Sequence, residues 1–171
     1  MFNLFSKSKA EKELEDLMAS YQEPVYWFVR RRVGNHDDAA DITQEVFIRV
    51  YRSLDSLKDR NAAKSWIFRI AVNEIARYME QQKKQHGEIT PEIENQVADG
   101  EYVDYDEAMS QKFQKALLRL SDRQREVFDL RYYQEMAYEE IAEVLGSSVS
   151  TMKTTYHIAK QKITDYILNE D

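Results

Sequence analysis

Six side chains in one stretch near the carboxyl end of the sequence could together bind a polyanion. Three threonine hydroxyls, one imidazole and two ammonium groups make up the set: Thr151, Thr154, Thr155, His157, Lys153 and Lys160. At helical spacing they fall largely on one face. Hydroxyls and cations contact phosphates, and hydroxyls can also reach base edges. This composition indicates noncovalent recognition of a nucleic acid rather than bond making.

A second polar set lies earlier in the sequence, where Arg69, Asn73 and Arg77 recur at four-residue spacing. A helix over about residues 62–82 places these three side chains on one face. Two arginines beside an amide could hold a nucleic-acid backbone or a base edge, and Lys64, with Lys83 and Lys84, would extend the cationic track. An ordinary solvated helix face has the same composition, and spacing alone favours that simpler interpretation.

The first polar set requires two short helices joined by a tight turn. A helix from Tyr138 to Leu145 ends at Gly146, a residue that tolerates the left-handed backbone conformation. Ser148 can then cap a second helix. The apolar residues of that helix recur at steps of three and four: Val149, Met152, Tyr156, Ala159, Ile163 and Ile167. This pattern predicts a helix-turn-helix, which by its spacing alone is not specific to DNA.

Three longer helices are predicted for the first half of the chain, over about 10–33, 35–54 and 62–82. Pro24 should bend or split the first, and the arginines at 30–32 are interpreted as its charged end. Asn35 can cap the second. The predicted inward residues are Val46, Phe47, Val50, Leu54, Trp66, Ile67, Ile70, Ala71, Ile75 and Tyr78.

The outward surface of the second predicted helix is polar, with one exposed isoleucine. It comprises Asp41, Gln44, Glu45, Ile48, Arg49 and Arg52. Periodicity by itself makes this a solvated surface.

The distribution of charge predicts how the helices are grouped. The net charge is −7, yet residues 86–109 hold no Lys or Arg against 8 Asp and Glu. That stretch also contains Pro91 and lacks a sustained apolar stripe, as expected of a flexible linker. The sequence therefore predicts an all-α protein, with helical domains at 1–85 and 108–171 joined by an acidic linker at 86–107.

Several functional classes are disfavoured by composition. With no cysteine and three scattered histidines, no metal site and no cofactor are expected. Paired carboxylates, a nucleophile beside a base and a phosphate loop are all missing at usable spacing, so no enzymatic activity is expected. The first residues are too weakly apolar for a signal peptide and no run approaches a membrane span, which predicts a cytoplasmic location.

Three motifs, in order and spacing, resemble the extracytoplasmic-function sigma factors of bacterial RNA polymerase. They are DDAADITQEVFIRVYRSL, KSWIFRIAVNEIARYMEQQKK and LSDRQREVFDLRYYQEMAYEEIAEVLGSSVSTMK. The resemblance implies a promoter-specificity subunit that binds core polymerase, through its β′ clamp helices and β flap, and promoter DNA. An anti-sigma factor is a further expected partner, and the acidic chain should bind DNA weakly without the polymerase.

The resemblance also assigns roles by position. It places core docking on the surface formed by Asp41, Gln44, Glu45, Ile48, Arg49 and Arg52, and minus-ten recognition on Lys64, Arg69, Asn73 and Arg77. It places minus-thirty-five recognition on Ser148, Thr151, Lys153, Thr154, Thr155, His157 and Lys160. The sequence departs from the family pattern at Glu135, where glycine is usual, at Ala137, where serine is usual, and at Thr155 and Ile158, where arginines are usual.

Two other functions share most of these features. A sigma-like mimic would sequester an anti-sigma factor instead of directing transcription, and the sparse cations of the last helix favour it slightly. The polar surface around Glu45 disfavours a mimic, which has less need of a polymerase-docking surface. A free-standing dimeric repressor would use the helix-turn-helix alone and leave the other two motifs unexplained.

Overall fold

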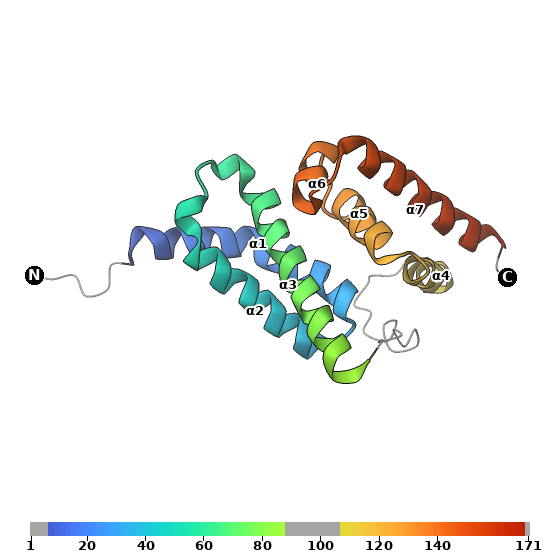
Figure 1. Cartoon of the computed structure of the whole chain (residues 1–171), viewed down its shortest axis with the longest axis horizontal. Coiled ribbons are helices and arrows are strands. Elements are labelled where there is room, and N and C mark those ends of the chain that lie inside the picture. The colour runs from blue at the N-terminus through green and yellow to red at the C-terminus, as the bar shows by residue number, and fades with distance from the viewer. Residues whose placement is uncertain (1–6, 88–106, 170–171) are drawn as a thin grey trace, which may run out of the picture. The chain divides into compact units, whose positions relative to one another are not determined.

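The computed structural model describes residues 7–87 and 107–169, which belong to two separate compact units. All regular structure within these ranges is helical and no strand occurs, which confirms the predicted all-α class (Figure 1). Nearly all of the predicted acidic linker, 86–107, lies outside the described residues. Each unit is considered by itself below.

The N-terminal unit is a three-helix arrangement in which every long helix contacts the other two (Figure 1). Two short 3₁₀ turns, η1 and η2, connect the second and third helices. The elements are α1 (Lys9–Val33), α2 (His36–Arg52), η1 (Leu54–Ser56), η2 (Arg60–Ala62) and α3 (Ala63–His86).

Helix α1 continues without interruption through Pro24, so it is not split in two at that residue. A proline inside a helix removes one backbone hydrogen bond. The turn that follows packs fully into the core, because Val25, Phe28 and Val29 are 0% exposed, and this packing outweighs the lost bond. The helix begins with a capping box between Ser8 and Glu11 and ends at Gly34, whose φ is 83°.

The arginines at the end of α1 are not the solvated helix terminus that their charge predicted. Arg30 and Arg32 are 8% and 7% exposed, and Arg31 is half-buried. Long aliphatic stems allow arginine to line an apolar interior while the guanidinium finds polar partners. This end of the helix is therefore part of the packed interior of the unit.

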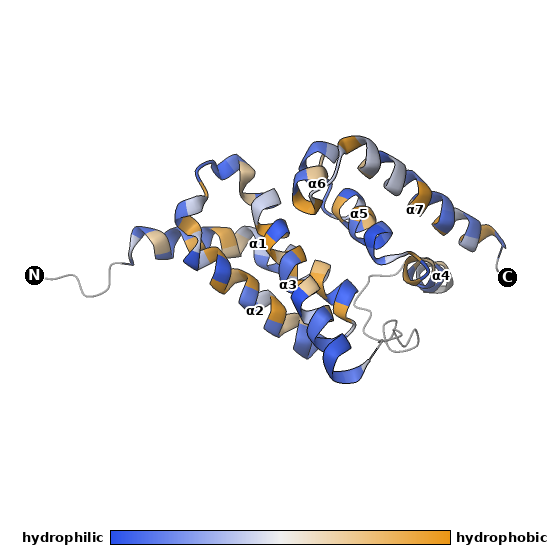
Figure 2. Cartoon of the chain, viewed as in Figure 1, coloured by the Kyte–Doolittle hydropathy of each residue, from blue (hydrophilic) through white to orange (hydrophobic). Residues whose placement is uncertain are grey.

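The inward stripe predicted for α2 is confirmed, and that of α3 is confirmed in part. Val46, Phe47, Val50 and Leu54 are all buried, as are Ile67, Ala71 and Ile75. Trp66, Ile70 and Tyr78 are half-buried instead. The prediction missed Phe68, which is fully buried and meets Phe28 edge to face at 5.3 Å. Helix α3 also runs one turn beyond the predicted end, into a hydrophilic segment shown in blue in Figure 2.

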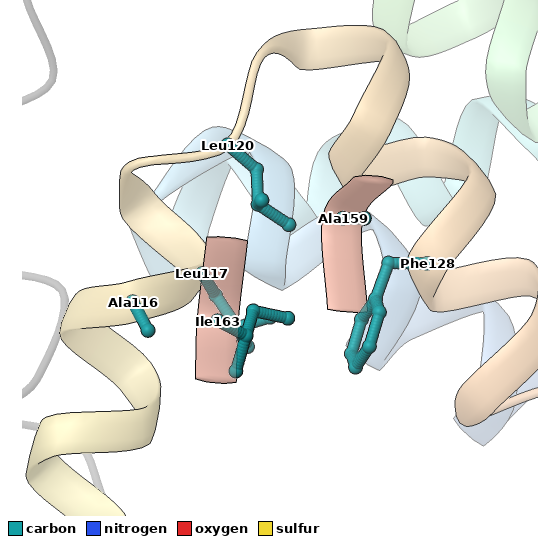
Figure 3. Close-up of a cluster of buried hydrophobic side chains, with 6 residues drawn as sticks. All are labelled: Ala116, Leu117, Leu120, Phe128, Ala159 and Ile163. Atoms are coloured by element: carbon teal, nitrogen blue, oxygen red, sulfur yellow. The ribbon is translucent and has the colours of Figure 1, made fainter. Parts of the chain in front are cut away.

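The C-terminal unit consists of four helices, of which the first three pack against the last. They are α4 (Glu107–Leu118), α5 (Asp122–Tyr132), α6 (Tyr138–Leu145) and α7 (Val149–Asn169). Helix α7 contacts each of the other three. Apolar residues from α4 and the turn after it, from α5 and from α7 meet in one cluster (Figure 3): Ala116, Leu117, Leu120, Phe128, Ala159 and Ile163.

The predicted helix-turn-helix is present as α6 and α7. Gly146 has φ 61° and ψ 44°, and a Cβ placed there would meet nothing within 4 Å. The backbone conformation therefore selects glycine at this position, not a shortage of space. The hydroxyl of Ser148 accepts from the Thr151 amide at 3.1 Å, which confirms the predicted cap. Arg123 of α5 donates to the Leu145 carbonyl at 3.0 Å and holds the turn.

Two of the departures from the family pattern lie where α6 begins. Glu135 has φ 53°, a left-handed conformation that disfavours a side chain with a Cβ. Ala137 occupies the cap position in extended conformation and provides no side-chain hydrogen bond. Half of a capping box remains, because Glu140 still accepts from the Ala137 amide at 2.9 Å.

Replacing Ala137 by serine should raise the free energy of unfolding of the C-terminal unit by about 1 kcal/mol, because the hydroxyl can accept from a free amide of α6. The extended backbone at Ala137 is already suited to a cap, so no rearrangement is required. Urea unfolding followed by circular dichroism measures the gain. Ala137→Val is the matched control, since valine adds bulk without an acceptor. An equal gain from valine would contradict the capping explanation.

No helix within the described ranges is both long and apolar enough to cross a membrane. The same residues contain no group of three histidine, aspartate or glutamate side chains placed to hold a metal ion.

Candidate nucleic-acid interface

The polar face predicted on the last helix is largely exposed. Ser148, Thr151, Lys153, Thr154, His157 and Lys160 are all exposed. Thr155 is half-buried, so its assignment to the free face was wrong in part. Position 155 is three residues from Met152 and four from Ala159, both fully buried, and it therefore borders the packed stripe.

The two lysines of this face each lie near an aromatic ring. The Lys153 ammonium lies 5.9 Å from the ring centroid of Tyr138, and the Lys160 ammonium lies 5.6 Å from that of Tyr156. Cation–π contacts of this kind are weak at exposed sites, so both cations remain available to a phosphate. Ile158, where the family pattern has arginine, is 39% exposed and leaves an apolar gap in the face.

The polar set on α3 is also presented to solvent. Arg69, Asn73 and Arg77 are exposed and Lys64 is half-buried. Arg77 forms an ion pair with Glu74, with Nη1 and Oε1 3.6 Å apart. For Arg69, no ion pair with a carboxylate is found among the described residues. The two arginines of this face therefore differ in their electrostatic surroundings.

The polar surface predicted on α2 is exposed at four of its six positions, namely Asp41, Gln44, Glu45 and Arg52. Ile48 was predicted to be exposed but is half-buried. On a helix, side chains three and four residues away lie alongside a residue and cover part of it. Arg49 is also half-buried, because it forms an ion pair with Glu74 of α3. It therefore takes part in the fold as well as in the surface.

Glu74 is the polar residue of this region that sequence reasoning missed. It is 7% exposed, and burial, as the main cause, raises the pKa of its carboxyl above the usual value of 4.5, with Arg49 opposing the shift. The signal was present in the sequence, because position 74 follows the buried Ala71 by three residues on the predicted inward stripe. A carboxylate on such a stripe requires a cationic partner.

Comparison with known proteins places the chain that carries these surfaces in a family. Residues 17–85 match the model for Sigma-70 region 2, and residues 110–163 match the model for Sigma-70, region 4. The chain is 30% identical over 162 residues to RNA polymerase sigma factor YlaC of Bacillus subtilis (strain 168), covering 91% of this chain and 92% of that protein. It belongs to the extracytoplasmic-function sigma factors of RNA polymerase.

A second relative supports the family assignment, and two solved structures share the fold. ECF RNA polymerase sigma factor SigW of Bacillus subtilis (strain 168) is 30% identical over 160 residues, covering 86% of this chain and 85% of that protein. The solved structure of the sigma factor RpoE in complex with the anti-sigma factor NepR from Bartonella quintana aligns with TM-score 0.79 and 23% identity, over 94% of this chain and 99% of that one. CnrH in complex with the cytosolic domain of CnrY aligns with TM-score 0.67 and 19% identity, over 94% and 91%. At these identities the structural likeness supports the fold alone.

The sigma-factor regions coincide with the exposed polar faces. The region 2 match spans most of α1 and all of α2 and nearly all of α3, and so contains both polar faces of the N-terminal unit. The region 4 match contains α5, α6 and most of α7, including the whole polar face that follows Ser148.

Helices α2 and α3 of this sigma factor are joined by a hydrogen-bonded group at one end. The Tyr78 hydroxyl donates to Oδ2 of Asp38 at 2.6 Å, and the Asn35 amide donates to the same oxygen at 2.7 Å. These two hydrogen bonds, the one from Tyr78 having the larger effect, lower the pKa of the Asp38 carboxyl below its usual 3.8. Burial, and then the same hydrogen bond, raises the pKa of Tyr78 to about 12.

Replacing Tyr78 by phenylalanine should lower the free energy of unfolding of the N-terminal unit by about 1 kcal/mol at neutral pH. Because the pKa of Asp38 is depressed in the folded state, its contribution is present above the unfolded pKa and is lost as pH falls through the folded value. The difference in free energy of unfolding between the parent protein and Tyr78→Phe should therefore shrink below pH 3.8. Urea unfolding followed by fluorescence of Trp27 and Trp66 measures it. A difference that is constant from pH 7 to pH 3 would contradict this account.

Proposed function

We propose that this sigma factor directs promoter-specific initiation by binding core polymerase and reading two promoter elements. In this proposal, residues 1–85 dock on the polymerase and recognise the minus-ten element, residues 108–171 recognise the minus-thirty-five element, and residues 86–107 link them. The observation that carries it is the exposure of three polar faces, on α2, α3 and α7, within the two matched sigma regions.

The α2 face is assigned to core polymerase, at its β′ clamp helices. It presents the carboxylates of Asp41 and Glu45 with Gln44 between them, all exposed. Charged groups of one sign favour a partner surface of the opposite sign and speed its association. Arg49 takes part in both the docking surface and the ion pair with Glu74, so its replacement would test docking less cleanly than replacement of Glu45.

The α3 face is assigned to the minus-ten element. Asn73 offers a donor and an acceptor to a base edge, and Arg69 and Arg77 flank it at the distance of one helical turn each. A base that has left the stack can be held by such a group while arginines contact the adjoining phosphates. Lys64, half-buried near the start of α3, extends the cationic surface.

The α7 face is assigned to the minus-thirty-five element. A second helix of a helix-turn-helix places its first turns in the major groove, and the exposed Thr151, Lys153 and Thr154 occupy those turns. With a net charge of −7 the free chain has little general attraction for DNA. Binding to promoters therefore depends on the polymerase, which holds both domains near their elements and raises their effective concentration.

Run-off transcription with core polymerase and a library of genomic promoters tests the proposal. The chain should confer promoter-dependent transcripts on core enzyme, and the transcripts should share two upstream elements. Core binding without any transcript would contradict it. A sigma-like mimic would instead show neither core binding nor transcription, yet bind a protein of the anti-sigma class, which is also a proposed regulator of this chain.

Within the α7 face, Lys153→Ala should weaken binding to a minus-thirty-five duplex and flatten its salt dependence by about one unit, because one phosphate contact is lost. Ile158→Arg should have the opposite effect, since this position is 39% exposed and is apolar at present. Fluorescence anisotropy between low and moderate salt measures both slopes. Glu143→Ala, on the exposed surface of α6, is the matched control. Unchanged slopes in both variants would show that this face does not contact DNA.

A further inference from the structure

A buried carboxylate connects the two exposed faces of the N-terminal unit. Glu74 of α3 is 7% exposed, and its Oε1 forms an ion pair with Nε of Arg49 on α2. The same oxygen lies 3.6 Å from Nη1 of Arg77, one turn further along α3. The side chains of Arg49 and Arg77 are 42% and 51% exposed. One buried acid therefore holds two guanidinium groups that both reach solvent.

The two arginines are held unequally. The contact with Arg49 is the closer one, whereas Arg77 is both further away and more exposed. An ion pair with a half-exposed partner at this distance is weak, so a DNA phosphate can compete for Arg77. Until it does, the negative charge of Glu74 subtracts from the attraction of Arg77 for any phosphate. Arg69, on the same face, has no such carboxylate among the described residues.

Packing alone does not explain an acid at this position. Glu74 follows the fully buried Ala71 by three residues and precedes Ile75, which is 2% exposed. An apolar side chain there would continue the buried stripe. Its loss of charge would leave the side chains of Arg49 and Arg77, which are 42% and 51% exposed and can be hydrated, so that no fully buried charge would remain without a partner. Burial is the main cause of the raised pKa of Glu74, which means that the surroundings disfavour its ionised form. The carboxylate charge is therefore not what stabilises the fold at this position.

We propose that Glu74 is a specificity-determining residue for promoter DNA, which weakens the attraction of Arg77 for phosphates irrespective of base sequence. Arg77 would then engage DNA chiefly where base contacts by Asn73 hold the strand in place. Lowering sequence-independent affinity raises the ratio of specific to nonspecific binding. This inference rests on the proposed minus-ten role of the α3 face.

The test uses the full chain and a fluorescein-labelled single-stranded DNA of random sequence, with binding followed by anisotropy at increasing salt. Glu74→Gln, which keeps the shape and removes the charge, should raise the affinity severalfold. It should also steepen the salt slope by about 0.7 units, the value for one additional phosphate contact on a single strand. Glu74→Met should give the same gain. Circular dichroism and tryptophan fluorescence check that each variant is folded.

Double variants show whether Arg77 carries the gain. Glu74→Gln should gain nothing in an Arg77→Ala background and should keep its full gain in an Arg69→Ala background, the matched control. A gain that survives without Arg77 would assign the effect to Arg49 and overturn the proposal, as would the absence of any gain in folded Glu74→Gln and Glu74→Met. If Arg77→Ala alone weakens binding while those two variants gain nothing, only this inference fails. If Arg77→Ala alone changes nothing, the minus-ten assignment of this arginine fails with it.

Discussion

Replacing Arg125 by alanine is expected to lower the free energy of unfolding of the C-terminal unit by about 3 kcal/mol, because several hydrogen bonds of a buried cation are lost together. Arg125 is 9% exposed. Its guanidinium donates to the carbonyls of Leu117, Leu118 and Leu120 at 3.3, 3.2 and 3.5 Å. Carbonyls at the end of a helix have no partner within that helix, and here one side chain from α5 satisfies the end of α4.

The loss should be large relative to the stability of so small a unit. Total stabilities of about 5–15 kcal/mol are usual for whole domains, and a change of 1 kcal/mol shifts the melting temperature of a domain of 60–100 residues by about 4–8 °C. The melting temperature should therefore fall by more than about 10 °C. Because α4 contributes Ala116 and Leu117 to the apolar cluster of Figure 3, its release would also expose that cluster.

The two tryptophans of the chain provide an internal control for this measurement. Trp27 and Trp66 both lie in the N-terminal unit, so their fluorescence reports that unit, whereas circular dichroism reports both. Arg125→Ala should shift part of the circular dichroism transition and leave the fluorescence transition in place. Arg125→Lys keeps the charge without the forked geometry and should lose somewhat less. An unchanged circular dichroism transition in Arg125→Ala would show that these contacts contribute little.

Replacing Asn73 by alanine is expected to reduce open-complex formation at a promoter by about tenfold or more, because a base-specific contact of this kind is worth about 1–3 kcal/mol. Asn73 is exposed in the middle of the α3 face, so its truncation removes no packing. Permanganate reactivity of thymines at a promoter identified by run-off transcription measures the melted fraction. Binding to core polymerase should be unchanged, since the docking surface is assigned to α2.

Two controls separate a lost DNA contact from a general defect. Helix content and tryptophan fluorescence of Asn73→Ala should equal those of the parent protein. Lys12→Ala, near the start of α1, should melt promoters normally, because Lys12 is exposed and α1 carries none of the assigned polar faces. Normal melting by a folded Asn73→Ala variant would show that Asn73 is an ordinary solvated residue that makes no required contact with DNA.

Local signals in the sequence were sufficient for most of the fold. Asn35, Ser148 and Gly146 mark the ends of helices through their own backbone and side-chain chemistry, and each does so in the structure. The spacing of Val46, Val50 and other apolar residues predicted the buried faces for the same reason, since a helix repeats every 3.6 residues whatever it packs against. The exposure of Asn73 and Lys153 also follows from spacing alone.

Only the tertiary structure decided which charged residues are buried and which groups they contact. Arg30 and Arg32, interpreted from the sequence as a charged helix end, are buried. Arg125 is buried as well, and its hydrogen-bond partners Leu117 and Leu118 lie on another helix. Glu74 and Arg49 belong to different helices, so their ion pair depends on how α2 packs against α3. A periodic pattern shows which side of a helix is apolar, whereas the depth and partner of a charge depend on residues distant in sequence. For that reason the sequence indicated the polar faces that we propose for DNA and polymerase, and the structure supplied the buried charge of Glu74 between two of them.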